Sequence, residues 1–524
     1  MLETPMEPIN APPSRLYLAM GAPPEPLNAA SDDWQPSRYA AEWMVGLPPS
    51  THDVRFATQM VYAVAQWTIQ RFRRALGREP DFVFEGPLVL ELFSAEMQNV
   101  VYERHFKKPT WPGAGESGVI RFGWYRQRRE SRGAHQPGAI ANTALSFDVI
   151  VHEVTHALVD GLRPHFLVPS NLDVLALHEA IADLVTLFAH FAWPAVVADA
   201  IKADPERFGE QLVRTLARQL GQTTSDAGEP LRTIRIDWVA QRTETPATSD
   251  YDAETDPHRR GLLLVSAVFE AFAEIYQRRA DPILALHRKG TALSDALIAL
   301  LAGEASKLAD QFLDIVIRAI DYLPPVDPTF GEYLRALITA DRALAPQDRW
   351  DYREALIYAF RRHRIPVEGV HDLSEGSLTW RQVRDPLLVP LDAFADVAAA
   401  LGSGRGSPGD IAMHTLAEHP ALCAGLALTP NADGDRAAQS RDAVDITVEQ
   451  IRSLRRVGAD RTSVAGAVMT ITARRPWGST PGVLGGCTLV LDERGHIAQH
   501  IWKSAHSADR LIRQQLGTVP GGIR

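Results

Sequence analysis

Apolar residues recur with a period of about 3.6 residues over many parts of the chain, which predicts amphipathic helices. The predicted helices cover 53–76, 148–160, 171–188, 205–220, 262–276, 284–301, 307–322, 329–344 and 349–362. Short alternating or continuous apolar runs, which are typical of strands, lie between the first and second of these helices. They cover 82–84, 87–93 and 118–125.

The last third of the chain has a different pattern. Residues 401–409 read Leu-Gly-Ser-Gly-Arg-Gly-Ser-Pro-Gly, a composition that predicts a linker or a long loop. Beyond it, helices are predicted at 444–451 and 510–516, and strands at 464–474, 487–492 and 497–502. We therefore expect a small α+β module here, and no motif assigns it a purpose.

Length and composition indicate several globular domains. A chain of 524 residues is too long for one ordinary hydrophobic core, and its 45% apolar and 23% charged residues are typical of globular proteins. The first fifty residues are rich in proline, which favours an extended, partly ordered arm. We expect an arm over 1–50, a β-containing lobe over 51–147, a helical lobe over 148–365 and a C-terminal extension over 366–524.

Charge and cysteine content narrow the function. A net charge of −10 argues against non-specific binding of nucleic acid. The two cysteines, Cys423 and Cys487, form neither a metal-binding spacing nor a disulfide framework, which fits a reducing compartment. The N-terminus lacks the pattern of a signal peptide, and no run of 18 apolar residues predicts a membrane span. These features predict a cytoplasmic protein that acts neither on nucleic acid nor in a membrane.

Residues 152–156 carry the clearest chemical motif, His-Glu-Val-Thr-His. Residues four apart lie on the same face of a helix, so His152 and His156 can present two imidazoles to one metal ion. Glu153 lies beside them and can reach a water molecule at that metal, as a zinc hydrolase requires. The pattern is short, and its chance occurrence on an ordinary core helix is the alternative.

The predicted helix over 171–188 supplies a third ligand. It carries Glu179 and, one turn later, Asp183. Glu179 completes a His-His-Glu zinc set, and Asp183 can hold the free ring nitrogen of a ligating histidine and so fix its orientation. His178 points about 100° away from Glu179 on the helix and is assigned to packing or to the surroundings of the ligands.

The motif His152-Glu153-x-x-His156, followed by Glu179-x-x-x-Asp183, resembles the thermolysin family of zinc endopeptidases, the gluzincins. The resemblance implies that the two histidines and Glu179 bind zinc and that Glu153 is the general base. It implies that Asp183 orients a ligating histidine, and it matches Asp148 to an aspartate four residues before the first histidine. It covers about 51–365 and is strongest at 148–190.

Further site residues follow from the resemblance alone. It implies that His258 donates a hydrogen bond to the developing oxyanion, with Asp252, Glu254 or Asp256 as its acidic partner. It implies that Arg232 binds the substrate carbonyl. It also implies that Trp111 precedes an edge strand around Ile120, which pairs with the substrate backbone.

The chain also departs from the family. The family's Asn-Ala before Trp111 is replaced by Pro109-Thr110, and a proline there cannot donate a hydrogen bond to a neighbouring strand. The tyrosine that binds the oxyanion in thermolysin has no counterpart between His156 and Glu179, where His165 is a candidate substitute. The acidic residues of the family's calcium sites are missing around 186–200, so we expect zinc without structural calcium.

The expected fold is α+β and two-lobed, with a β-containing N-terminal lobe, an active-site helix in the cleft, a helical C-terminal lobe and an appended small α+β domain. The expected function is that of a zinc metalloendopeptidase, which hydrolyses peptide or protein substrates with a zinc-activated water. The alternative is a latent or inactive peptidase-fold binding protein, controlled through its C-terminal module and a regulatory protein partner.

Overall fold

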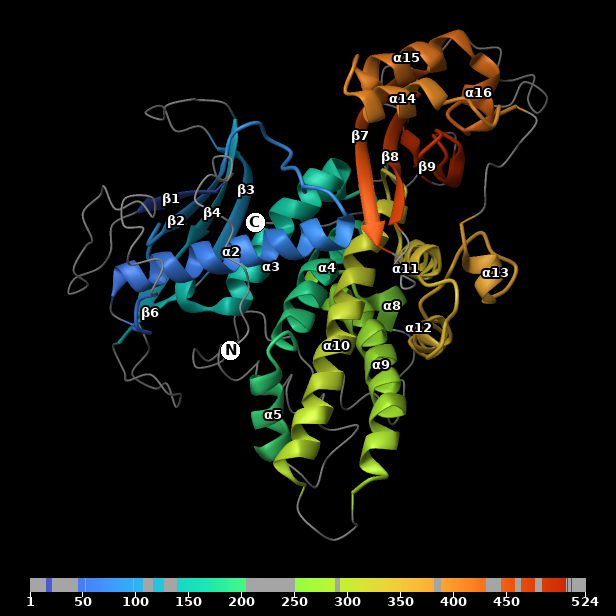
Figure 1. Ribbon diagram of the computed structural model, residues 1–524. Helices are drawn as coiled ribbons and strands as arrows, with labels where there is room; N and C mark the ends of the chain where they lie inside the picture. The colour runs from blue at the N-terminus through green and yellow to red at the C-terminus, as the bar shows by residue number, and fades with distance from the viewer. Residues whose placement is uncertain are drawn as a thin grey trace. The chain divides into compact units, whose positions relative to one another are not determined.

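The structure is a computed structural model that describes residues 16–20, 46–51, 53–97, 99–106, 116–126, 139–203, 250–287, 293–380, 388–429, 444–457, 463–475, 483–505, 507 and 510. These residues form a mixture of helices and sheets, as predicted for an α+β protein (Figure 1). They divide into two compact units. The first contains the described residues from 16 to 70 and from 81 to 161, and the second contains 71–80 and the described residues from 162 onward.

The first unit contains a four-stranded sheet in the order β1-β2-β4-β3. The strands are β1 (Leu16–Met20), β2 (Leu88–Leu92), β4 (Ser117–Phe122) and β3 (Val100–Phe106). β1, β2 and β4 are parallel, whereas β3 is antiparallel to β4. The sequence pattern does not predict β1, which lies within the expected proline-rich arm. A short ribbon of β5 (Trp124–Arg126) and β6 (Ile140–Asn142) leads into the helix α3 (Phe147–Leu162).

The strand predicted around Ile120 is β4, but the prediction that it lies at an edge of the sheet is wrong. Ile120 is buried in β4 and is paired with Leu90 of β2 on one side and with Tyr102 of β3 on the other. Its backbone groups are therefore used within the sheet and cannot pair with a substrate. Among the described strands, β3 ends this sheet on that side.

Long helices dominate the second unit. They are α4 (Leu172–His190), α5 (Pro194–Ala203), α9 (Pro257–Leu284), α10 (Asp295–Ala319), α11 (Phe330–Leu344) and α12 (Tyr352–Arg362). The rings of Phe188, Phe272 and Phe312 pack together at centroid distances of 5.2 to 5.5 Å and join α4, α9 and α10. The helix α2 (Val54–Leu76) runs from the first unit into the second. The helices predicted at 284–301 and 307–322 are largely one helix, α10.

The second unit also contains an antiparallel sheet in the order β10-β9-β8-β7. Its strands are β7 (Asp445–Val457), β8 (Ser463–Arg474), β9 (Leu484–Asp492) and β10 (Ile497–Lys503). Short helices precede it, namely α13 (Glu375–Leu378), α14 (Ala395–Ser403), α15 (Pro408–Glu418) and α16 (Pro420–Gly425). Phe394 of this helical region and Met469 and Leu489 of the sheet share one buried core.

The helix predicted at 444–451 is wrong, because these residues belong to β7. Ile446, Val448 and Ile451 pack against the core, and the register with β8 shifts between Val448 and Gln450. A bulge of this kind interrupts the two-residue alternation of a strand, so the apolar residues no longer show the pattern typical of strands. Residues 401–409, predicted as a linker or a long loop, instead contain the end of α14, a turn at 404–407 and the start of α15.

The C-terminal sheet shares a buried network with the rest of its unit. Arg163 is 2% exposed, and its guanidinium donates to the carbonyl of Ile320 at 2.9 and 2.8 Å. It also donates to the hydroxyls of Thr470 in β8 and Thr488 in β9, both at 3.1 Å. The described residues from 366 onward thus lie in the same compact unit as α4.

No single helix within the described ranges has both the length and the apolar content needed to cross a membrane. One pair of described helices, α4 and α5, passes that test together by length and composition, and the two are bent by 77° relative to each other. α4 is buried along almost its whole length inside the unit, as expected of a core helix.

Candidate metal centre

The helix α3 carries the His-Glu-Val-Thr-His motif in a buried setting. Its apolar residues Ile150, Val151, Val154, Ala157 and Leu158 are fully buried. His152, Glu153 and His156 are also buried, each with 4 to 5% of its surface exposed. The rings of the two histidines lie one turn apart with centroids 4.5 Å from each other and planes at 87°. The predicted helix and the shared face of the histidines are confirmed.

Asp148, His152, His156 and Asp160 follow at intervals of four residues and form a polar series on one face of α3. Asp160, one turn after His156, is completely buried and accepts hydrogen bonds from the Tyr102 hydroxyl at 2.7 Å and from Arg104 Nε at 2.9 Å. Burial, together with the charge of Asp160, raises the pKa of Tyr102 above its usual value, so the phenol stays protonated and donates. Asp160 therefore ties α3 to β3. Asp148, at the other end of the series, lies half-buried in the first turn of α3.

The helix α4 supplies the predicted carboxylate. Asn171 caps its N-terminus, because the Asn171 side chain accepts a hydrogen bond from the backbone N–H of Asp173 at 2.7 Å. Glu179 lies in the middle of this helix and is 1% exposed. Asp183 lies one turn later and is half-buried. Its contact with a ligating histidine stays a prediction.

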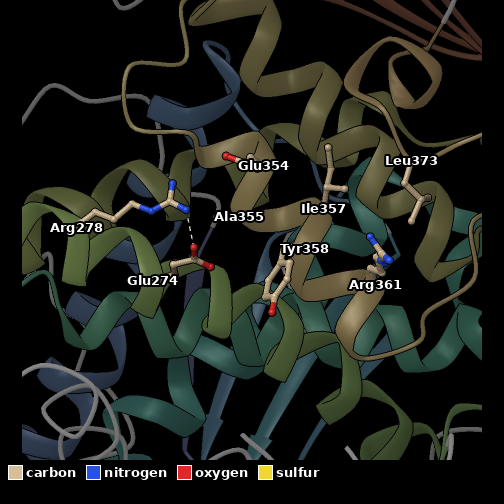
Figure 2. Close-up of a pocket in the computed structure, with 8 residues that line it drawn as sticks. All are labelled: Glu274, Arg278, Glu354, Ala355, Ile357, Tyr358, Arg361 and Leu373. Atoms are coloured by element: carbon tan, nitrogen blue, oxygen red, sulfur yellow. Dashed lines mark hydrogen bonds and ion pairs between the residues drawn. The ribbon is translucent and has the colours of Figure 1, made fainter.

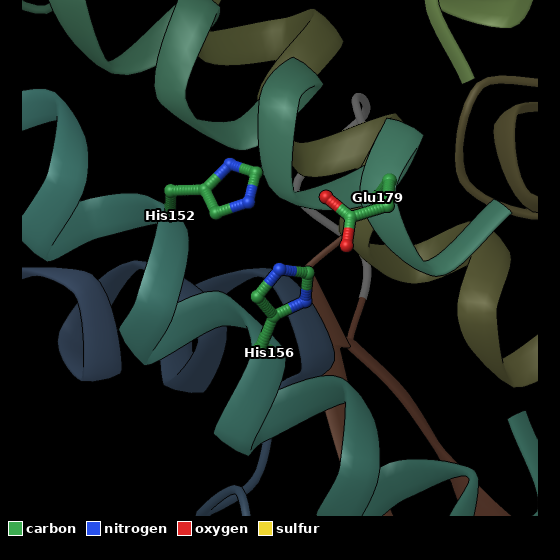
Figure 3. Close-up of side chains that lie close together, drawn as sticks. All are labelled: His152, His156 and Glu179. Carbon is green, nitrogen blue, oxygen red and sulfur yellow. The ribbon is translucent and has the colours of Figure 1, made fainter. Parts of the chain in front are cut away.

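The three predicted ligands come together. His152, His156 and Glu179 each offer a ligand atom, and these atoms all lie within 4.8 Å of one another (Figure 3). A tetrahedral zinc site with bonds of about 2.0–2.2 Å requires ligand atoms roughly 3.4 Å apart, so small side-chain rotations suffice. Two imidazoles and one carboxylate form a donor set that suits catalytic zinc. Among the described residues, no second group of three such side chains meets this criterion.

His258 lies beside this group, in the first turn of α9. Its Nε2 atom is 3.5 Å from Oε2 of Glu179, and its side chain is 46% exposed. Its Nδ1 atom is 3.9 Å from Oδ1 of Asp256, one of the three carboxylates considered as its partner. Glu254, another of them, instead binds Arg259 at 3.0 Å. A half-exposed imidazole next to a buried ligand set can meet both a substrate and the ligands.

A buried network next to His258 was missed at the sequence level. Arg260 donates to Oδ1 of Asp173 from Nε at 2.7 Å and lies 2.6 Å from the same oxygen through Nη2. The Tyr251 hydroxyl donates to Oδ2 of Asp173 at 2.6 Å, as does the backbone N–H of Phe330 at 2.9 Å. The sequence signal for this pairing is weak: Asp173 lies six residues before Glu179, and Arg260 lies two residues after His258.

The remaining predicted residues are not brought to the ligands. Trp111 and Arg232 lie outside the described residues. Ile120 is internal to its sheet. His165 contacts Glu449 of β7 at 3.3 Å, and this hydrogen bond is the main cause of the lowered pKa of Glu449. His165 is therefore engaged with the C-terminal sheet.

A separate surface pocket of about 560 Å³ lies between α9 and α12 (Figure 2). Glu274 and Arg278 on α9 and Tyr358 and Arg361 on α12 line it, and Arg278 binds Glu274 at 2.5 Å. Glu274 lies more than four turns farther along α9 than His258, which is about 24 Å at 1.5 Å per residue. The pocket is therefore distinct from the candidate metal centre.

Comparison with known proteins finds no match to this chain among family models, curated proteins or solved structures.

Proposed function

We propose that the protein is a zinc-dependent metallopeptidase with a thermolysin-like arrangement of its site. The observation that carries the proposal is the buried convergence of His152, His156 and Glu179, with Glu153 next to His152 on the same helix. The two imidazoles and the carboxylate fill three positions of a tetrahedral zinc ion, and the fourth position stays open for water or substrate. The buried carboxylate of Glu153 gives the site a base, which a purely structural metal site does not need.

When bound, zinc supplies a Lewis acid that polarises the scissile carbonyl and lowers the pKa of water. Glu153 takes the proton from the attacking water and returns it to the departing amine. This role requires the carboxylate to lie beside the ligands on the same helix, and its burial shields it from bulk water. The substrate is a peptide or a protein.

His258 donates a hydrogen bond to the oxygen on which negative charge develops. A donor fixed beside that oxygen stabilises the transition state more than it stabilises the bound substrate. Only such an interaction, stronger in the transition state, raises the rate. Its distance of 3.5 Å from Glu179 supports this role, since a donor here faces the ligand set. The half-exposed ring remains accessible to a bound substrate.

Metal analysis with a matched variant tests the proposal. Purified wild-type protein should contain one zinc per chain, and Glu179→Ala should lose most of it, whereas Glu368→Ala, at an exposed glutamate, should keep it. The wild type should then cleave a peptide library. Zinc without cleavage would favour the alternative, a peptidase-fold binding protein. Iron in place of zinc, or no metal after reconstitution, would refute the zinc peptidase.

A further inference from the structure

We propose that Asp173 and Arg260 form a clamp that positions His258 beside Glu179. This inference rests on the proposed function, in which His258 acts on the substrate. Asp173 lies six residues before Glu179 in the first turn of α4, and Arg260 lies two residues after His258 in the first turn of α9. A bond between Asp173 and Arg260 therefore joins the ligand helix to the helix that carries His258.

The clamp is buried and richly bonded. Asp173 is 2% exposed and Arg260 is 4% exposed. Arg260 also donates from Nη1 to the carbonyls of Tyr251 and Glu254, the latter at 2.9 Å, and its guanidinium carbon lies 4.0 Å from the centre of the Tyr251 ring. A buried ion pair is favourable only when hydrogen bonds satisfy both of its members, and these contacts do so.

The same contacts fix the chain just before His258. Because Arg260 holds the carbonyls of Tyr251 and Glu254, the segment that precedes α9 cannot move away from the helix. Asp256 caps α9 by accepting from the backbone N–H of Arg259 at 2.9 Å, and its side chain lies 3.9 Å from His258. The backbone that carries His258 is thus held from both sides, by the cap before it and by the clamp after it.

Close packing of the two helices adds to this restraint. A Cβ atom at Gly261 would lie 2.9 Å from the carbonyl oxygen of Ala176 and 3.5 Å from Cβ of Glu179. The backbone of α9 therefore lies directly against the turn of α4 that carries the proposed ligand. A shift at the start of α9 would move His258 away from Glu179, and a displacement of about 1 Å at a reacting group can cost about 100-fold in rate.

Two variants of the clamp and one control test this role. Arg260→Lys keeps the charge but loses the planar fork that reaches three partners at once, and Asp173→Asn removes the charge at nearly constant volume. Arg259→Lys is the matched control, because Arg259 is adjacent, 72% exposed and bound to Glu254. Hydrogen exchange of peptides covering 251–262 should quicken at least 10-fold in both clamp variants and stay unchanged in the control.

Measurements of kcat and KM test whether the clamp acts through His258. Both clamp variants should keep one zinc per chain and lower kcat about 10- to 100-fold, with KM within about threefold of the wild type, since the lost contact is made in the transition state. In a His258→Ala background, Arg260→Lys should have no further effect on kcat. Arg260 then acts as a positioning residue rather than as part of the general structure.

Other outcomes separate this inference from the proposed function. Unchanged exchange in both clamp variants would overturn the clamp whether or not the protein hydrolyses peptides. Equal losses of kcat in the presence and absence of His258 would also overturn it, because the effect would then be independent of the imidazole. If the wild type cleaves nothing, the proposed function and the role in catalysis both fail, and the exchange experiment alone decides whether the clamp orders the start of α9.

Discussion

The guanidinium of Arg163 donates to the hydroxyl of Thr488 at 3.1 Å, although 325 residues separate them in the chain. Arg163 directly follows α3, and Thr488 lies in the C-terminal sheet. Thr488 in turn donates to the carbonyl of Leu323 at 2.8 Å. One buried set of hydrogen bonds thus holds both the C-terminal sheet and the segment that follows α3.

Removing this hydroxyl should destabilise the protein. Thr488→Val keeps the shape of the side chain but leaves Arg163 without one acceptor and Leu323 without its donor, and each unsatisfied buried group costs about 1–3 kcal/mol. Urea unfolding should report a lower free energy of unfolding by about that amount. Thr447→Val, at an exposed site on β7, should change it by less than about 0.5 kcal/mol. Equal stabilities of both variants would contradict this account.

Gly261 should not tolerate a side chain. In Gly261→Ala, the new methyl group would meet the backbone of α4 at 2.9 Å, and overpacking of this kind typically costs about 1–3 kcal/mol. Because the clash lies against the turn that carries Glu179, zinc affinity measured by chelator competition should fall as well.

The control for this variant is Gly303→Ala on α10. A Cβ there meets no atom within 4 Å, so alanine should raise stability by up to about 1 kcal/mol through its higher helix propensity. A Gly261→Ala protein with wild-type stability and zinc affinity would show that α4 and α9 are not closely packed at this point.

Because of Asp321, the free energy of unfolding should depend on pH in the acid range. Burial alone would raise its pKa, but Arg78, which binds it through two hydrogen bonds at 2.7 and 2.6 Å, together with Arg456, lowers it from 3.8 to about 2. The carboxylate therefore stabilises the fold above about pH 4, and this contribution is lost as the pH falls toward 2. It amounts to about 2 kcal/mol at neutral pH, of which about 1 kcal/mol disappears between pH 5 and pH 3.

The test compares the wild type with Asp321→Asn in urea at several pH values. The variant removes the carboxylate that binds Arg78 and Arg456, so its free energy of unfolding should be lower than that of the wild type at pH 7. This difference in unfolding free energy should narrow by about 1 kcal/mol from pH 5 to pH 3. Asp392→Asn, at an exposed aspartate, serves as the control. A difference that stays constant over this range would refute the lowered pKa.

Glu153→Gln should separate zinc binding from hydrolysis. Glutamine preserves the shape of the side chain but cannot accept the proton, so kcat should fall about 10²–10⁴-fold while the protein keeps one zinc per chain. Metal analysis and peptide cleavage on the same preparation provide the measurement, with Glu368→Gln as the unaffected control. Retained cleavage in Glu153→Gln would rule out Glu153 as the base.

The sequence predicts best what depends on neighbouring residues. The helix predicted at 148–160 is α3, and the helix predicted from Asn171 to Phe188 is α4, because apolar periodicity and the Asn171 cap are local signals. The spacing of His152 and His156 on one face follows from helical geometry alone. Their meeting with Glu179 was predicted from the donor set that zinc requires and from the family resemblance, because no local signal brings two helices together.

The errors arise where position depends on distant partners. Ile120 was expected at an edge, but the order of strands in a sheet is not written in any one strand, and β1 and β3 lie outside β2 and β4. Asp173 and Arg260 are 87 residues apart, and no period or spacing links them. The bulge in β7 makes the apolar pattern irregular, so the sequence did not predict a strand there.

The network around Arg163 also sets an order of events during synthesis. Its acceptors Thr470 and Thr488 leave the ribosome only after more than 300 further residues, which takes roughly 15–60 s at about 5–20 residues per second. Until then the segment after α3 lacks the partners that hold it. The newly made chain therefore carries Arg163 well before its acceptors in β8 and β9 exist, and this guanidinium cannot complete its hydrogen bonds until the last strands are made.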